Sequence, residues 1–177
     1  MPNSTATGGA LQVTSESFNI YHLMHDFIAG LTGIDNTLVR PMYQPNPPTI
    51  PSFNTNWIAY NIVSRDADGH TYHSLNSSDV FNMQQQKVLD LTISMYGSNA
   101  LQNITNFRAS IELSQNWDTL RSYNISFQQC GKAIRTPELY NMRWLDKYTI
   151  TITLNQLAIT NASIMSIINA TPVEILT

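Results

Sequence analysis

The sequence predicts a single α+β domain in which a mostly antiparallel sheet is flanked by helices. The chain has 177 residues, enough for one domain with its own core and too few for two of ordinary size. Apolar residues make up 42% of the chain, as in ordinary globular proteins. Helical and strand periodicities follow one another in the order helix, strands, helices, strands, with no internal repeat. We therefore expect a loose arm at 1–13 and one domain over 14–177.

The first predicted element is an amphipathic helix of about five turns. Its N-cap is expected at Thr14 or Ser15, and Gly33 is expected to end it. The apolar face of this helix is formed by Phe18, Tyr21, Met24 or His25, Ile28 and Leu31.

An extended segment at 38–43 leads into a proline-rich segment at 44–51. Its four prolines remove amide donors and hold the backbone near polyproline geometry. The segment is therefore neither a helix nor a central strand.

The remainder of the chain is expected to contain five strands and two further helices. The strand at 142–155 has the clearest alternation of apolar and polar residues, and Ser98 is the expected N-cap of the second helix. A polar loop at 65–78 is expected to turn at Asp68-Gly69. The predicted strands cover 57–63, 80–96, 125–129, 142–155 and 164–168, and the helices cover 98–113 and 114–123.

Charged residues are unusually few. Asp, Glu, Lys and Arg make up 12% of the chain, about half of the usual quarter, and the net charge is −3. Such a surface repels its own copies only weakly, which suits a subunit that packs against itself. The nine Lys and Arg residues form no run, which argues against nucleic acid as a primary ligand.

The sequence shows no signal for a membrane or for secretion. No stretch is long and apolar enough to span a bilayer, and the first residues lack the pattern of a signal peptide. The single cysteine, Cys130, excludes an internal disulfide and a zinc cluster built on thiolates. We expect a protein that assembles inside the cell and has no membrane partner.

Two pairs of histidines are candidates for a metal site. His22 and His25 lie three residues apart on the predicted helix, and His70 and His73 lie in the polar loop. Neither pair has a third ligand at a recognised spacing, so we expect no metal. A small metal-dependent hydrolase built on His70 and His73 is the alternative.

No other residues converge on a catalytic or cofactor-binding pattern. There is no nucleophile elbow, Cys130 has no cue for a histidine partner, and the carboxylates are spread over different elements. Gly97 stands at a strand-to-helix junction, but the lysine and glycine spacing of a phosphate loop are missing, so a tight turn is expected there. We expect no catalytic residue, no cofactor and no enzymatic activity.

Large aromatic residues on the predicted strands are expected to fill the core. These are Trp57, Trp144 and Tyr148. A receptor- or saccharide-binding module is the alternative, and it would require an exposed cluster of Trp57, Tyr60 or Tyr72.

Three patches between about residue 16 and residue 170 resemble the neck-terminator (tail-terminator) proteins of tailed bacteriophages. The first is Val39-Arg40-Pro41 with Gln44-Pro45-Asn46-Pro47-Pro48, Pro51 and Trp57. The second is 89–96 followed by Gly97-Ser98-Asn99-Ala100. The third runs from Pro137-Glu138-Leu139-Tyr140-Asn141 through Arg143-Trp144 to 148–154. The chain departs from the family in having fewer arginines near the last strand, where it carries Asp146, Lys147, Asn155 and Gln156.

The resemblance implies a subunit that forms a ring, expected to be a hexamer, in the tail or neck of the virion. The ring would cap the tail tube and meet the head-side connector, with sheath proteins as further neighbours and genomic DNA passing through without specific binding. Assembly would take place in the host cytoplasm. Another virion role, in the baseplate, tube or head completion, is the alternative.

A stiff, already extended segment loses little entropy when it contacts a neighbour. We therefore expect the contact between subunits, or with a neighbouring protein, at Gln44, Pro45, Asn46, Pro47, Pro48 and Pro51.

Overall fold

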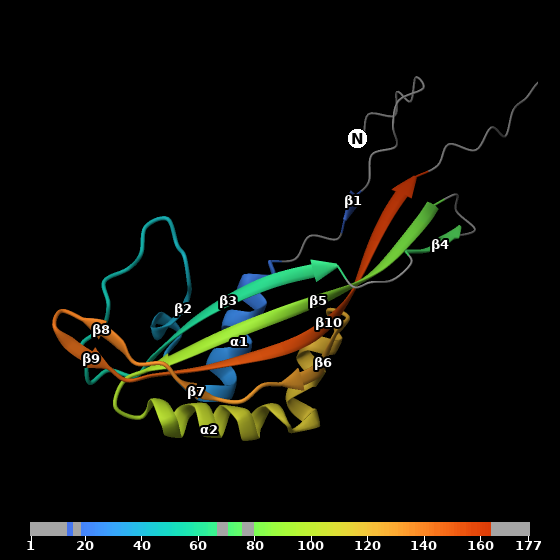
Figure 1. Cartoon of the computed structure of the whole chain (residues 1–177). Helices are drawn as coiled ribbons and strands as arrows, with labels where there is room; N and C mark the ends of the chain where they lie inside the picture. Colours follow the sequence, from blue (N-terminus) through green and yellow to red (C-terminus); the bar gives the residue numbers. More distant parts are fainter. Residues whose placement is uncertain (1–13, 16–18, 67–70, 76–79, 164–177) are drawn as a thin grey trace, which may run out of the picture.

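The computed structural model describes residues 14–15, 19–66, 71–75 and 80–163. Within these residues it contains an eight-stranded sheet with the central order β1-β10-β5-β3-β2 and a separate two-stranded hairpin, β8–β9 (Figure 1). The strands of the large sheet are β1 (Thr14–Ser15), β2 (Val39–Pro41), β3 (Trp57–Asp66), β4 (Tyr72–Leu75), β5 (Val80–Tyr96), β6 (Ile125–Cys130), β7 (Ile134–Arg135) and β10 (Lys147–Ser163). The hairpin consists of β8 (Glu138–Tyr140) and β9 (Arg143–Leu145).

Two strands of 17 residues, β5 and β10, form the centre of the sheet. They pair antiparallel along their whole length, from Tyr96–Lys147 to Val80–Ser163. β3 and β4 pair with β5, and β6, β7 and β1 pair with β10, all antiparallel. Only β2 is parallel to its neighbour, β3, among the described strands. The predicted fold class, an α+β domain with a mostly antiparallel sheet, is confirmed.

One face of the sheet is covered by helices, and the core lies between the two layers (Figure 1). Burial of these apolar side chains, at about 25 cal/mol per Å² removed from water, is the main stabilising contribution. The helices are α1 (Ile20–Thr32), α2 (Ala100–Ile111) and α3 (Asp118–Arg121), with 3-10 turns η1 (Asn36–Leu38) and η2 (Ser114–Trp117). The sheet contributes Leu89, Leu91, Ile93, Met95, Ile150, Ile152 and Leu154 to this core. The helices contribute Met24, Phe27, Ile28, Ile104, Phe107, Ile111 and Leu120.

The opposite face of the central strands carries no helix among the described residues. It is apolar at Trp57, Ala59 and Tyr96, where Leu145 packs, and polar further along the strands. Its side chains bond across the strands: Ser94 Oγ lies 2.9 Å from Thr149 Oγ1, and Thr153 Oγ1 donates to Asp90 Oδ1 at 3.1 Å. Arg65 Nε lies 2.8 Å from the other Asp90 oxygen. A one-sided antiparallel sheet of this kind leaves a large polar surface for water or for a neighbour.

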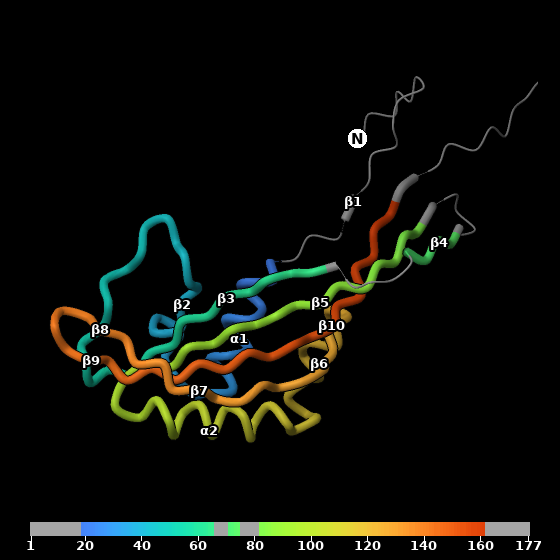
Figure 2. Tube along the Cα trace, viewed as in Figure 1, coloured from blue at the N-terminus to red at the C-terminus, as the bar shows by residue number. Residues whose placement is uncertain are grey.

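The molecule is elongated along β5 and β10. Figures 1 and 2 show the far halves of these strands leaving the helix-covered body together with β4. The loop 42–56 and the β8–β9 hairpin lie at the opposite end (Figure 1). The long strands therefore separate two ends of different construction.

The first helix is shorter than the sequence predicted. It begins at Ile20 and is capped by Asn19, whose Oδ1 accepts from the amides of Tyr21 and His22 at 3.1 and 3.2 Å. The expected caps, Thr14 and Ser15, pair with β10 instead. The predicted end at Gly33, which has φ 66°, is confirmed.

The predicted strand at 142–155 is divided. Residues 143–145 belong to the β8–β9 hairpin, and β10 starts after Asp146 and continues to Ser163. The prediction that Trp144 fills the core is therefore wrong, because this side chain is 70% exposed.

Several boundaries also differ from the predictions. α2 is preceded by Asn99 rather than Ser98 at its N-cap, and 114–123 forms η2 and the short α3. The expected loop 65–78 contains the end of β3 and all of β4. The arm at 1–13, the turn at Asp68-Gly69 and the strand candidate at 164–168 lie outside the described residues.

None of the helices described here has the length and apolar character required to cross a bilayer.

Candidate functional site: the loop–hairpin end

We use the term loop–hairpin end for the loop 42–56 together with the β8–β9 hairpin. Both lie beside the first residues of β3 and β10 and the last residues of β5. Two of the three patches that resemble the phage family contribute directly to it, and the third supplies the Gly97 turn next to it. This end also carries the most exposed large apolar side chains of the described chain, Met142 and Tyr43.

Hydrogen bonds hold the proline-rich segment in place. The Arg40 guanidinium donates to the Thr37 carbonyl at 2.9 Å and to the Thr49 carbonyl at 2.8 Å, which joins the two sides of the loop. The Gln44 amide donates to the Pro41 carbonyl at 2.8 Å. Of the expected contact residues, four are exposed, namely Pro45, Asn46, Pro47 and Pro48, whereas Gln44 and Pro51 are half-buried.

The end of the loop is attached to the turn between β5 and α2. The Asn99 amide donates to Asn56 Oδ1 at 2.9 Å. Gly97 has φ 106°, and a Cβ at this position would lie 2.6 Å from the Thr55 carbonyl oxygen. Only glycine therefore fits at this position, which agrees with the turn predicted for Gly97.

Glu138 joins the hairpin to the sheet. Its Oε2 accepts from Lys147 Nζ at 3.2 Å and from the Tyr96 hydroxyl at 3.4 Å. Burial raises the pKa of the Tyr96 phenol above its ordinary value, so this group stays a neutral donor. The contact fixes the first residue of β8 to the ends of β5 and β10.

The hairpin also packs against the loop. The rings of Phe53 and Tyr140 lie 6.2 Å apart, and the Arg143 guanidinium lies 4.6 Å above the Phe53 ring. Arg135 binds Asp146 through Nη2 at 2.6 Å and Nε at 3.2 Å, just before β10 begins. These contacts hold the hairpin in one orientation.

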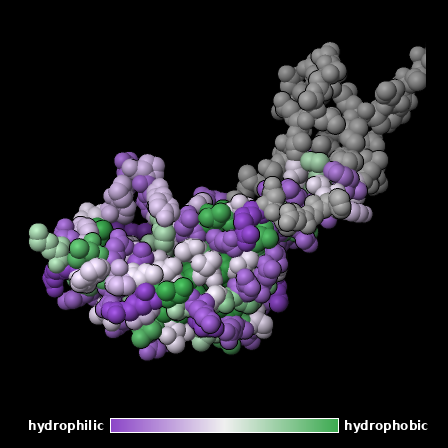
Figure 3. Space-filling model, in the orientation of Figure 1, coloured by the Kyte–Doolittle hydropathy of each residue, from purple (hydrophilic) through white to green (hydrophobic). Residues whose placement is uncertain are grey.

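The two faces of the hairpin differ. Because side chains alternate along a strand, Tyr140, Arg143 and Leu145 point inward, and Leu145 is buried. The cross-strand pair Leu139 and Trp144 points outward, with 58% and 70% of these residues exposed. Figure 3 shows apolar residues at this end of the molecule.

The turn that connects β8 to β9 places an apolar residue in an unfavourable conformation. Asn141 has φ 47° and Met142 has φ 60°, as in the tight turns that connect paired strands. Asparagine tolerates this conformation, but methionine does so at a cost on the order of 1 kcal/mol. Met142 is 96% exposed, so its position is not explained by packing within the chain.

A pocket of about 350 Å³ opens beneath the proline-rich segment. Its apolar wall includes Pro41, Met42, Pro47, Pro48 and Trp57, and Glu138 and Lys147 line its polar edge. The Trp57 ring stacks on Tyr96 at 4.0 Å with an angle of 3°. The volume falls within the range of about 300–1,000 Å³ typical of ligand pockets.

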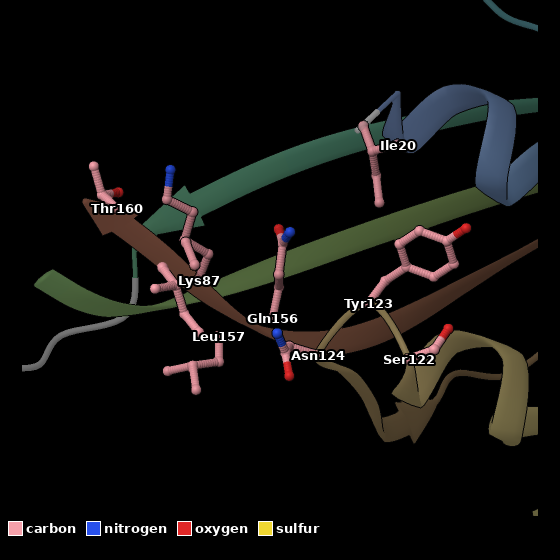
Figure 4. A pocket seen from close by; sticks show the side chains of 10 residues that line it. Ile20, Lys87, Ser122, Tyr123, Asn124, Gln156, Leu157 and Thr160 are labelled. Carbon is pink, nitrogen blue, oxygen red and sulfur yellow. The ribbon is translucent and has the colours of Figure 1, made fainter. Parts of the chain in front are cut away.

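A second cavity, of about 310 Å³, lies where β10 leaves the body (Figure 4). Lys87, Tyr123, Asn124 and Gln156 line it, together with β10 residues 157–160. These side chains come from β5, β10 and the segment between α3 and β6. They bring together one amine and several neutral groups, without a carboxylate or a histidine, so they resemble no acid–base site.

The histidine pair on α1 has a third partner that spacing analysis overlooked. His22, His25 and Asp26 offer ligand atoms within 4.8 Å of one another. His25 already has a partner on each side of its ring: Nδ1 lies 2.9 Å from Asp26 Oδ1, and Nε2 lies 3.0 Å from the Asn36 carbonyl oxygen. Asp26 lies four residues after His22, a spacing that was readable from the sequence. These bonds account for the cluster without an ion, and the absence of a functional metal stays a prediction.

The His25 cluster predicts a pH-dependent stability. The hydrogen bond to Asp26 raises the pKa of His25, although partial burial opposes this. Because the pKa is raised in the folded state, its stabilising contribution is fully present below about pH 6.5 and is lost as the pH rises through the folded pKa. We expect urea unfolding to show a lower free energy of unfolding at pH 8.5 than at pH 6. Asp26→Asn should flatten this difference; an unchanged difference in that variant would contradict the assignment.

Other residues singled out by the sequence do not meet in a site. Cys130 is half-buried, and burial raises the pKa of its thiol, which disfavours the reactive thiolate. Tyr60 is buried, whereas Tyr72 is exposed on β4. Trp57 and Tyr72 lie opposite Tyr96 and Gln84 of β5, about 40 Å apart along the strand, so they form no saccharide platform. His70 lies outside the described residues.

Comparison with known proteins identifies one family. A family model described as phage neck terminator protein matches residues 19–177. No curated protein matches the chain. The match covers the loop–hairpin end and all helices of the described chain, and it confirms the resemblance seen in the three sequence patches. The chain belongs to the family of phage neck terminator proteins.

Proposed function

We propose that copies of this chain close into a ring, with six subunits expected, that caps the finished tail tube and joins it to the head-side connector. The family match over residues 19–177 carries this proposal, since it makes the chain a structural component of the phage neck. The role is geometric: one surface of the ring would fit the end of the tube and another would not, so the tube stops growing. No catalytic step is required.

The structure supports a subunit that works in contact with neighbours. A polar sheet face is open, a stiff proline segment stands on the surface, and apolar side chains are exposed at the same end. A net charge of −3 on 177 residues keeps the repulsion between copies low. In a ring the same interface is repeated at every boundary, so any like-charge clash would be multiplied.

The ring is tested by the mass of the purified protein. Light scattering together with negative-stain images should show closed rings of about six subunits, alone or after addition of the tail tube protein. Rings added to polymerising tube protein should shorten the tubes and appear at one end of each. Attachment along the tube or at the baseplate would favour a different virion role. A chain that stays monomeric and leaves tube length unchanged would contradict the proposal.

A further inference from the structure

We propose that the outward face of the β8–β9 hairpin of one copy inserts into the pocket beneath the proline-rich segment of the next copy. This inference rests on the proposed function, because it names the contact that joins the subunits of the ring. We use the term knob for Leu139 and Trp144 on this face together with Met142 in the turn at the tip of the hairpin.

The knob is apolar, exposed and held in place before any partner arrives. Four contacts fix the hairpin: Glu138 to Lys147, Glu138 to Tyr96, Tyr140 to Phe53, and Arg143 over the Phe53 ring. A preorganised surface loses little conformational entropy on binding. Tryptophan in such a position is the residue type most often found to dominate the energy of an interface.

The backbone conformation of Met142 also supports a role of the knob in binding. A residue with φ 60° in a tight turn is normally glycine or asparagine, which avoid the backbone strain. Met142 keeps a large apolar side chain at this strained position although 96% of the residue is exposed. Residues held in strained backbone conformations cluster at functional sites, which supports a role for this side chain in binding.

The pocket is suited to receive such a knob. Its wall of Pro41, Met42, Pro47, Pro48 and Trp57 is apolar, and its volume is about 350 Å³. The hairpin of the same chain does not fill it. Glu138 reaches the edge of the pocket, but the knob residues do not line it and remain exposed.

A second copy is the occupant that fits both surfaces. Knob and pocket are different surfaces of one chain, so their contact is heterologous, and a heterologous contact closes into a ring when its rotation divides a full turn. Both lie at the same end of the elongated subunit (Figure 1), so rotation about an axis along the sheet brings them to the same height. Three charged residues line the pocket: Glu138 and Lys147 pair with each other, and Arg40 donates to backbone carbonyls. The knob residues carry no charge, so this lining does not repel them.

Single-cysteine variants test this contact. Cys130→Ser removes the native thiol, and Met142→Cys and Pro47→Cys are then prepared separately, with chains of different tag length. Mild oxidation of the mixed, assembled proteins should give a disulfide-linked heterodimer whose mass contains one chain of each kind. Each variant alone should stay monomeric on the denaturing gel. Self-linking of Met142→Cys would indicate a two-fold contact between knobs and would overturn the proposal.

A matched pair of leucines provides the second test. Leu139→Ala in the knob should raise the subunit concentration at which rings dissociate by about tenfold. Leu101→Ala on α2, where the exposed fraction is 56% compared with 58% for Leu139, should leave it unchanged. If both variants changed the dissociation concentration equally, the assignment of the knob as the contact surface would be wrong. If the wild-type chain forms rings but the cysteine variants give no mixed disulfide, this contact alone is refuted. If the wild-type chain forms no rings either with or without tube protein, the proposed function is refuted.

Discussion

Replacement of Gly97 by alanine is expected to lower the free energy of unfolding by about 2–5 kcal/mol. The φ of 106° strains any residue with a side chain, and the new Cβ would lie 2.6 Å from both the Thr55 carbonyl oxygen and Asn56 Oδ1. Backbone cannot move away as a flexible side chain would, so the loop 42–56 must shift. The cost is measured by urea unfolding of the purified variant.

Gly30 provides the matched control. It lies in α1, is exposed, and has no neighbouring atom within 4 Å of the place that a Cβ would take. Gly30→Ala should therefore stabilise the chain by up to about 1 kcal/mol through helix propensity. Two glycine-to-alanine changes of opposite sign would establish that the turn, rather than the loss of glycine as such, determines the effect. A neutral Gly97→Ala would contradict the close approach of the loop.

Trp117→Ala is expected to lower the free energy of unfolding by about 3–5 kcal/mol. The indole is 5% exposed and packs between Phe27, at 5.4 Å, and Phe127, at 4.8 Å. Its Nε1 donates to the Ile111 carbonyl at 2.7 Å, so the change also leaves a buried acceptor without its donor. Thermal or urea unfolding measures the loss.

Trp144→Ala separates assembly from stability. This indole is 70% exposed, so its removal should change the stability of the single chain by less than about 0.5 kcal/mol. It should nevertheless weaken the ring, whereas Trp117→Phe should lower stability and leave the ring contact unchanged. If Trp144→Ala destabilised the chain as strongly as Trp117→Ala, the hairpin would be a structural element and not a docking surface.

Local sequence patterns predicted the parts of the fold whose conformation is determined by neighbouring residues along the chain. The alternation of 80–96 and the glycine that ends α1 were readable because burial of one strand face and a left-handed helix end each require particular residues. The proline segment was predicted for the same reason, since proline fixes its own backbone. The short strands β4 and β7 were missed because their residues become strands only through partners far along the chain.

The position of Trp144 shows why alternation alone misplaces a residue. The pattern from 142 to 155 is continuous, and it does not reveal that the chain changes from a small hairpin to the large sheet at Asp146. The turn Asn141-Met142 also lacks the glycine that normally indicates a hairpin. At the candidate site, sequence analysis found the proline segment but not the knob, because an exposed tryptophan on a strand contradicts the usual preference for burial.

The pairing of β5 with β10 also governs how fast the chain reaches its folded state. Partners in this ladder are separated by 51 residues at Tyr96–Lys147 and by 83 residues at Val80–Ser163. To form contacts between such distant segments, the chain must first lose the entropy of closing a large loop, and only then do the contacts stabilise it. Proteins dominated by such contacts fold in milliseconds to seconds. On the ribosome, β5 has no β10 to pair with until translation has passed the end of the helices and the hairpin. One edge of β5 thus stays open from the synthesis of β5 until β10 has been made, and the polar run Gln84-Gln85-Gln86-Lys87 favours hydration of that edge in the meantime.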